Sequence, residues 1–263
     1  MASGVFPRGT PPILYSYAVA EPSRFAEVTF AEALRAAGVS AKARPYATKP
    51  NIARLKPSYV AAKTVAEHQS APLGEDVKVT LKVSQNLHAS ATPFLVGALK
   101  AKDTASTGFD VARGFLTSLG LDLSGAQQAD GAGGDAHFTP SFMVSYLSAM
   151  AKRPDYPTFQ HALPVLGRDG TLWNIQTESP AAGHVFAKTG TFAVEDPLNK
   201  RTFVTGKGLA GYLTTAQGER CAFAIYVNNV SVSTAPDEVT RVVGQALGEV
   251  AAAMSLTTPR ATS

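Results

Sequence analysis

The stretch "GHVFAKTGTF", residues 183–192, predicts a β-strand that contains two unexpected residues. Apolar residues suited to a β-strand run through it, but Lys188 places a charge beside them and Gly190 removes a side chain. Glycine and lysine are both depleted in strands, and a glycine inside a strand weakens it. The Lys-Thr-Gly-Thr segment therefore points to a chemical role for this strand.

The residues that follow predict two more strands and a helix. "GLAGYLTTAQGERCAFAIYVNN", residues 208–229, indicates a hairpin whose turn is "AQGE". Residues 236–254 predict an amphipathic helix with Asp237 and Glu238 in its first turn. Its expected apolar face consists of Val239, Val242, Val243, Ala246, Leu247, Val250 and Met254. Three antiparallel strands and a terminal helix after a helical middle indicate an α/β (α+β) fold.

Helical spacing of apolar residues also occurs earlier in the chain. It predicts helices in three segments: residues 21–40, 109–121 and 140–154. Ser23 is the expected N-cap of the first helix and Gly38 its expected stop. Residues 77–83 fit both a strand and one face of a helix, and both alternatives stay open. Residues 41–72 are polar and proline-containing, and predict an irregular connection.

Composition excludes several classes of protein. Of the 263 residues, 45% are hydrophobic and 17% charged, which supports a sizeable core and excludes global disorder. The net charge of +4 is spread without a basic run, so we expect no nucleic-acid partner. The one cysteine and the five histidines show no ligand spacing, so we expect no metal and no cofactor. No apolar run predicts a transmembrane segment, and the first residues show no signal-peptide pattern.

Two short motifs carry a resemblance to a known family. Ser84-Gln85-Asn86 and Lys188-Thr189-Gly190 match the S-x-N and K-T-G signatures of the penicillin-interacting serine acyl-transferases. Residues 70–254 resemble the D-alanyl-D-alanine carboxypeptidase/endopeptidase family, the low-molecular-mass class C penicillin-binding proteins. The matching stretches include "SQNLHA", "DGAGGDAHFTP", "LPVLGRDGTL" and "AKTGTF".

The resemblance implies a fold, a domain division and a location. The fold is that of penicillin-binding proteins and serine β-lactamases, present in part, with antiparallel strands packed against helices and a C-terminal amphipathic helix. Residues 1–69 are expected to be the tail of an inserted domain with a connection. Residues 70–257 would form the C-terminal portion of a transpeptidase-like domain, and residues 258–263 a disordered tail. The family works outside the cytoplasmic membrane, in the periplasm or extracellularly.

The resemblance also implies the role of each site residue. Cleavage of an acyl-D-Ala-D-Ala bond needs a nucleophile, a base, an oxyanion hole and a group that binds the terminal carboxylate. The implied catalytic residues are Ser84, which relays a proton to the leaving amine, Asn86, which bonds the peptide carbonyl, and Lys188, which attracts the carboxylate. The implied substrate-binding residues are Thr189 and Thr191, through their hydroxyls and the Thr191 N–H, and Gly190, which admits the substrate backbone. The ligands are peptidoglycan stem peptides or β-lactams.

The third signature, Ser-x-x-Lys, does not occur in the 263 residues, and neither does Thr-x-x-Lys. Ala132 stands where the family usually has serine, and Ser90 near its usual glutamate. We therefore expect the chain to begin inside the family's insertion, without the acylated serine. An exposed sheet edge would then favour self-association.

Three hypotheses stay open at this point. The chain is the C-terminal part of an active serine carboxypeptidase, or a catalytically inactive relative that binds peptidoglycan or a partner. As a third alternative it is a hydrolase that uses Ser84 as nucleophile, with Lys82 or Lys188 as the base.

Overall fold

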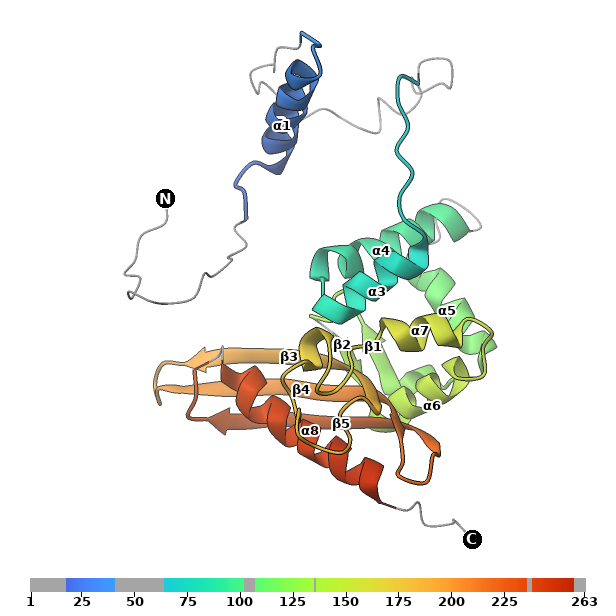
Figure 1. The fold of residues 1–263 in the computed structure, drawn as a ribbon, viewed down its shortest axis with the longest axis vertical. Coiled ribbons are helices and arrows are strands. Elements are labelled where there is room, and N and C mark those ends of the chain that lie inside the picture. Colours follow the sequence, from blue (N-terminus) through green and yellow to red (C-terminus); the bar gives the residue numbers. More distant parts are fainter. Residues whose placement is uncertain (1–17, 41–63, 102–106, 135, 236–237, 258–263) are drawn as a thin grey trace. The chain divides into compact units, whose positions relative to one another are not determined.

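The structure is a computed structural model, and it describes residues 18–40, 64–101, 107–134, 136–235 and 238–257 (Figure 1). Most of the predicted irregular connection and the predicted tail at 258–263 lie outside these residues. The chain divides into two units, residues 1–68 and 69–263, and each is described by itself.

The first unit contains one described helix, α1 (Pro22–Ala36). Its N-cap is Glu21, so the prediction of Ser23 as the cap is wrong. Proline is favoured at the first helical position, because its φ is already helical and its missing N–H would have no helical partner there. Gly38 follows the helix with φ +82°, as expected of a residue that ends a helix.

Five helices precede the main sheet in the described part of the second unit. They are α3 (Leu73–Val83), α4 (Asn86–Lys100), α5 (Gly108–Ser118), α6 (Pro140–Met150) and α7 (Tyr156–Ala162). The ambiguous residues 77–83 are therefore helical. Glu75 and Asp76 place two carboxylates in the first turn of α3, where their interaction with the helix dipole stabilises the helix. Leu81, on the same helix, packs against the hydrophobic cluster that contains Tyr212.

The main sheet has three antiparallel strands in the order β3-β4-β5. They are β3 (Val185–Asp196), β4 (Arg201–Thr214) and β5 (Arg220–Val232). The predicted strands and hairpin are confirmed, but the long β3–β4 hairpin extends beyond the prediction. The far end of this hairpin is polar, with charged residues at 195–201, so it lacks the alternation of apolar and polar residues that predicts a strand. A separate pair, β1 (Ala126–Gln128) and β2 (Ala136–Phe138), forms a small second sheet.

Helices cover both faces of the main sheet (Figure 1). Helix α8 (Val239–Leu256) packs on one face, where Leu247 and Ala251 meet Val185, Leu209 and Phe223 in one buried cluster. Helices α6, α7 and α3 pack on the other face around Tyr212. The Tyr212 hydroxyl donates to the Leu147 carbonyl oxygen at 2.8 Å and ties the sheet to α6.

The buried face of α8 differs from the predicted one. The residues that are buried are Val239, Val243, Gly244, Leu247, Gly248, Ala251, Ala252 and Ser255. Val242, Val250 and Met254, predicted to be on this face, are 37–47% exposed, and Ala246, also predicted there, is exposed as well. Glu238 is the N-cap rather than a first-turn residue, and Asp237 lies outside the described residues. Gly244 and Gly248 lie on the buried face against Ile175, and the missing side chain of Gly248 allows a close approach there.

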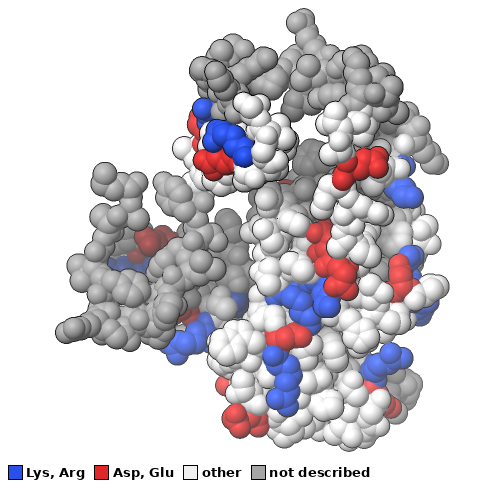
Figure 2. Space-filling view, turned by 45° about the horizontal axis from the view of Figure 1, so that its top comes forward, with Lys and Arg blue, Asp and Glu red and all other residues white. Residues whose placement is uncertain are grey.

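No helix in the described part of the chain combines the length and apolar character that crossing a bilayer requires. On the face shown in Figure 2, basic and acidic side chains are interspersed rather than gathered into a large patch of one sign.

The close approach at Gly248 gives a stability prediction. A Cβ there would lie 2.4 Å from Ile175 Cγ2, and Ile175 is 2% exposed with little room to move. We expect Gly248→Ala to lower the free energy of unfolding by about 1–2 kcal/mol through overpacking. The matched control, Gly114→Ala in α5, meets nothing within 4 Å. It should raise that free energy by about 0.5–1 kcal/mol. Urea denaturation measures both, and equal stabilisation by the two changes would contradict the packing of α8.

Candidate active site

Strand β3 has an open edge that begins at Lys188. On the side away from β4, residues 164–166 bond to β3 only as far as Ala187, through Leu166 N to Val185 O and Ala187 N to Pro164 O, both 2.9 Å. Backbone groups of alternate residues point to the same side of a strand. The N–H and C=O groups of Thr189 and Thr191 therefore point to this edge, which has no strand partner there in the described chain. An extended peptide can add to such an edge as a further strand.

Gly190 faces open space. A Cβ built on it would meet no atom within 4 Å, so internal packing does not require glycine at this position. Gly211 in β4 is different, because its Cβ would lie 2.0 Å from the Phe186 carbonyl oxygen. The absence of a side chain at Gly190 leaves room for another backbone to approach the strand.

Lys188 and Ser84 lie 104 residues apart in sequence and form a hydrogen bond. The Lys188 Nζ donates to Ser84 Oγ at 2.8 Å and to the Thr189 carbonyl oxygen at 2.6 Å. Ser84 follows α3 in the left-handed conformation, with φ 57°, and Gln85 caps α4 by accepting from the N–H of Leu87. The tripeptide therefore both caps α4, through Gln85, and contributes to the candidate site, because the turn between the two helices brings Ser84 to β3.

The charge of Lys188 has no carboxylate partner among the described residues. Burial lowers its pKa from the ordinary value of 10.5 to about 8. The attraction between this ammonium group and a bound anion is stronger than it would be in free solvent, because the local dielectric constant is lower. At neutral pH the group is still mostly protonated and can hold a carboxylate.

An ion pair that sequence reasoning missed fixes the position of α3. Lys82 Nζ contacts both carboxylate oxygens of Asp169 at 2.7 Å and donates to the Leu163 carbonyl oxygen at 2.6 Å. Asp169 also accepts from the Val165 N–H at 2.8 Å. Lys82 is thus bonded to Asp169 and Leu163. Of the two lysines considered as a base for Ser84, Lys188 is the one that contacts Ser84.

The two threonines of the motif meet different partners. Thr189 Oγ1 lies 3.2 Å from Thr171 Oγ1, in the short 3₁₀ turn Gly170–Leu172. Thr191 Oγ1 accepts a hydrogen bond from Lys207 Nζ at 2.6 Å. Lys207 belongs to β4 and was missed by sequence reasoning. Its only sequence signal is a lysine between two glycines in an otherwise apolar strand.

Asn86 is the exposed first residue of α4, and it makes no hydrogen bond to the other predicted site residues in the described chain. The loop after β1 packs against the same helix. A Cβ on Gly131 would lie 2.1 Å from the Ala89 carbonyl oxygen, and the Asp130 carboxylate accepts from the Ala132 N–H at 2.7 Å. This loop therefore shapes one wall beside α4.

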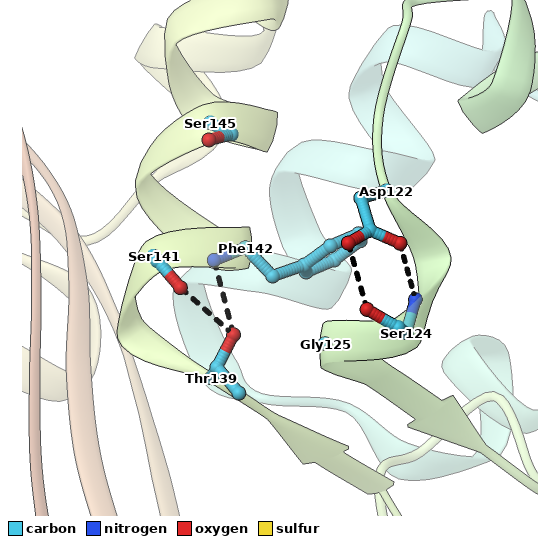
Figure 3. A pocket seen from close by; sticks show the side chains of 7 residues that line it. All are labelled: Asp122, Ser124, Gly125, Thr139, Ser141, Phe142 and Ser145. Atoms are coloured by element: carbon cyan, nitrogen blue, oxygen red, sulfur yellow. Dashed lines mark hydrogen bonds between the residues drawn. The ribbon is translucent and has the colours of Figure 1, made fainter.

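A separate pocket of about 300 Å³ lies between β2, α6 and the turn before β1 (Figure 3). Hydroxyl groups dominate its lining: Ser124 is bonded to Asp122 at 2.7 Å, and Thr139 Oγ1 lies 3.2 Å from Ser141 Oγ. None of the six predicted site residues lines it. Within the described ranges, no group of three or more His, Cys, Asp or Glu side chains is placed to hold a metal ion.

The two site lysines give a pH prediction. Both Lys188 and Lys207 have a pKa lowered to about 8. Between about pH 8 and 10.5 the unfolded chain then binds more protons than the folded chain, so the free energy of unfolding rises with pH. We expect this rise in urea denaturation between about pH 7.5 and 9.5, below the range in which tyrosines ionise. Lys207→Met should reduce the slope, and Lys152→Met, on an exposed turn, should not. An unchanged slope in Lys207→Met would contradict the lowered pKa.

The chain matches known proteins over most of its length. Residues 1–247 match the model of the D-Ala-D-Ala carboxypeptidase 3 (S13) family. The D-alanyl-D-alanine carboxypeptidase of Actinomadura sp. strain R39 is 30% identical over 258 residues, which are 95% of this chain and 44% of that protein. The D-alanyl-D-alanine carboxypeptidase DacB of Haemophilus influenzae is 29% identical over 67% of this chain and 36% of its own length.

The fold is that of a solved penicillin-binding protein. The structure of penicillin binding protein 4 (dacB) from Haemophilus influenzae, complexed with a β-lactam, aligns with a TM-score of 0.64 at 24% identity. The alignment covers 89% of this chain and 52% of that one. The fold predicted from the sequence is confirmed, and this chain spans about half or less of the length of these relatives. The chain belongs to the D-Ala-D-Ala carboxypeptidase 3 (S13) family.

Proposed function

We propose that the chain binds the acyl-D-Ala-D-Ala end of a peptidoglycan stem peptide, or a β-lactam, along the open edge of β3. It does so as the substrate-binding part of a serine-type D-Ala-D-Ala carboxypeptidase/endopeptidase. The observation that carries the proposal is the Lys188 ammonium group, which lies at this edge, 2.8 Å from Ser84 Oγ, with no carboxylate partner in the described chain.

Each group at the edge has a part in binding. Lys188 attracts the terminal carboxylate, and the hydroxyls of Thr189 and Thr191 donate to it. The substrate backbone adds to β3 over Gly190. The Thr191 N–H stabilises the oxyanion that forms during acyl transfer, Ser84 relays a proton to the leaving amine, and Asn86 bonds the substrate amide.

No residue is assigned as the nucleophile in this proposal. No Ser-x-x-Lys occurs in the 263 residues. We propose that this chain recognises its ligand without being acylated, and that hydrolysis needs a serine that these residues do not supply. The alternative of a catalytically inactive binding relative shares the same recognition site and differs only in whether such a serine exists.

A second candidate function is favoured by one observation. Ser84 and Lys188 form a serine–lysine pair at 2.8 Å, and the lysine pKa is lowered to about 8, as a general base requires. In this reaction the neutral amine takes the Ser84 proton, and Ser84 Oγ bonds to the substrate carbonyl carbon. The proton then passes to the amine as the carbonyl C–N bond breaks, and water afterwards hydrolyses the ester on Ser84 and restores its hydroxyl. At neutral pH most Lys188 is protonated, which disfavours this route.

The proposed binding can be tested with an N-acyl-D-Ala-D-Ala peptide in isothermal titration calorimetry. Lys188→Met should weaken binding by about tenfold or more, because it removes a charged donor to the carboxylate. The matched control is Lys152→Met, which removes a lysine from an exposed turn after α6. Equal loss of affinity in both variants, or unchanged affinity in Lys188→Met, would contradict carboxylate binding at this edge.

By family membership we propose that the protein acts outside the cytoplasmic membrane, where peptidoglycan lies. Measuring the protein in periplasmic, extracellular and cytoplasmic fractions of the source cells tests this, and an exclusively cytoplasmic distribution would contradict it.

We also propose that the isolated chain self-associates. Helix α4 exposes Leu87, Phe94 and Leu99 by 72%, 80% and 77%, and β3 has its open edge nearby in the same unit. Apolar side chains and open strand edges both favour association. Sedimentation equilibrium should detect dimers or larger species, and Phe94→Lys should weaken them. A monomer at every concentration up to the millimolar range would contradict the proposal.

A further inference from the structure

Lys207 is a buried lysine in the middle of strand β4. It is 2% exposed and lies in register opposite Thr191, on the face of the sheet that α8 covers. Gly244 of α8 lies beside its aliphatic chain, since a Cβ there would make an ordinary van der Waals contact with Lys207 Cε at 3.8 Å. Lysine is almost never fully buried unless it is paired with an opposite charge.

The ammonium group of Lys207 has only neutral partners in the described chain. It donates to Thr191 Oγ1 at 2.6 Å and to Thr240 Oγ1 at 3.4 Å, and it forms no ion pair with the described residues. Burial, with a smaller contribution from the positive charge of Lys188, lowers its pKa to about 8. A buried charge without a counter-charge costs free energy, which a nearby anion would offset.

The other charges around Lys207 do not compensate it. Thr240 lies in the first turn of α8, where the helix dipole favours negative charge and disfavours a cation. At this end of α8, Glu238 and Arg241 form an ion pair with each other at 3.1 Å. On β3 the nearby charge is Lys188, which is positive as well. The Lys207 ammonium group therefore has positive charge near it, from Lys188 and from the α8 dipole, and the described carboxylate at this end of α8 is already paired with Arg241.

The hydrogen bond from Lys207 fixes what the Thr191 hydroxyl can do. A threonine hydroxyl has one hydrogen to donate and two lone pairs to accept with. Because Lys207 Nζ occupies a lone pair of Thr191 Oγ1, the Thr191 hydrogen is left for another acceptor. Thr191 itself is exposed at the open edge of β3, so that acceptor can come from solvent or from a ligand.

We propose that Lys207 is a positioning residue for the ligand carboxylate. It holds the Thr191 hydroxyl as a donor toward the edge, and it places a second positive charge behind that hydroxyl. Lys207 acts through Thr191 rather than by touching the ligand. The proposal rests on the proposed function, and it predicts that the site prefers a free terminal carboxylate to a neutral amide.

The test compares N-acyl-D-Ala-D-Ala with its C-terminal carboxamide by isothermal titration calorimetry. The wild-type chain should bind the carboxylate more tightly. Lys207→Met, which keeps the length of the side chain and removes the charge, should weaken carboxylate binding by about tenfold and carboxamide binding much less, because hydrogen bonds to charged groups are the stronger ones. Thr191→Val should have a similar effect. The double variant should lose no more than the stronger single variant, because the two residues act in series.

Thr240→Val is the matched control, since it removes only the longer contact to Lys207. It should keep the preference for the carboxylate. If Lys207→Met also keeps that preference, or if the losses of the two single variants add, the role of Lys207 is wrong while the proposed function stands. If the wild-type chain binds neither ligand, the proposed function fails, and this inference fails with it. Circular dichroism spectra of the variants, compared with that of the wild-type chain, show whether a lost preference for the carboxylate is due to unfolding.

Discussion

The hydrogen bond from Lys188 to Ser84 is the contact on which the account of the site depends. It joins the open edge of β3 to the junction of α3 and α4, across 104 residues of sequence. Two other features make it possible. Ser84 takes a left-handed conformation that ends α3, and the ion pair between Lys82 and Asp169 holds that helix against residues 163–172. Without the contact of α3 with residues 163–172, Ser84 would not lie within hydrogen-bond distance of Lys188.

Positive charge without a counter-charge is the second constraint. Lys188 reaches the edge of β3 directly, and Lys207 approaches it from beneath Thr191. Burial lowers the pKa of both groups, because each ammonium loses hydration that no described carboxylate replaces. A protein that only needed stability would gain from an apolar residue at position 207. An anion-binding site accounts for both lysines at once.

The sequence predicted the strands and the helix that follows them, because each of these has a local signal. The six candidate site residues came from the two motifs of the family resemblance, and the fold brings Ser84 and Lys188 of that set into contact. The sequence could not choose between helix and strand for residues 77–83, since both patterns fit and only packing on the core decides. It placed Val242, Val250 and Met254 on the buried face of α8, where the structure buries a different face. Lys82–Asp169 and Lys207–Thr191 were missed because each joins residues that only the fold brings together.

The most direct test of the account is intact-mass spectrometry of the purified chain after incubation with a penicillin. Recognition without acylation should give no increase in mass, and the penicillin should compete with N-acyl-D-Ala-D-Ala for binding. A stoichiometric penicilloyl adduct would contradict recognition without acylation. Peptide mapping would then identify the acylated residue, and an adduct on Ser84 would establish the serine–lysine pair with Lys188 as the catalytic centre.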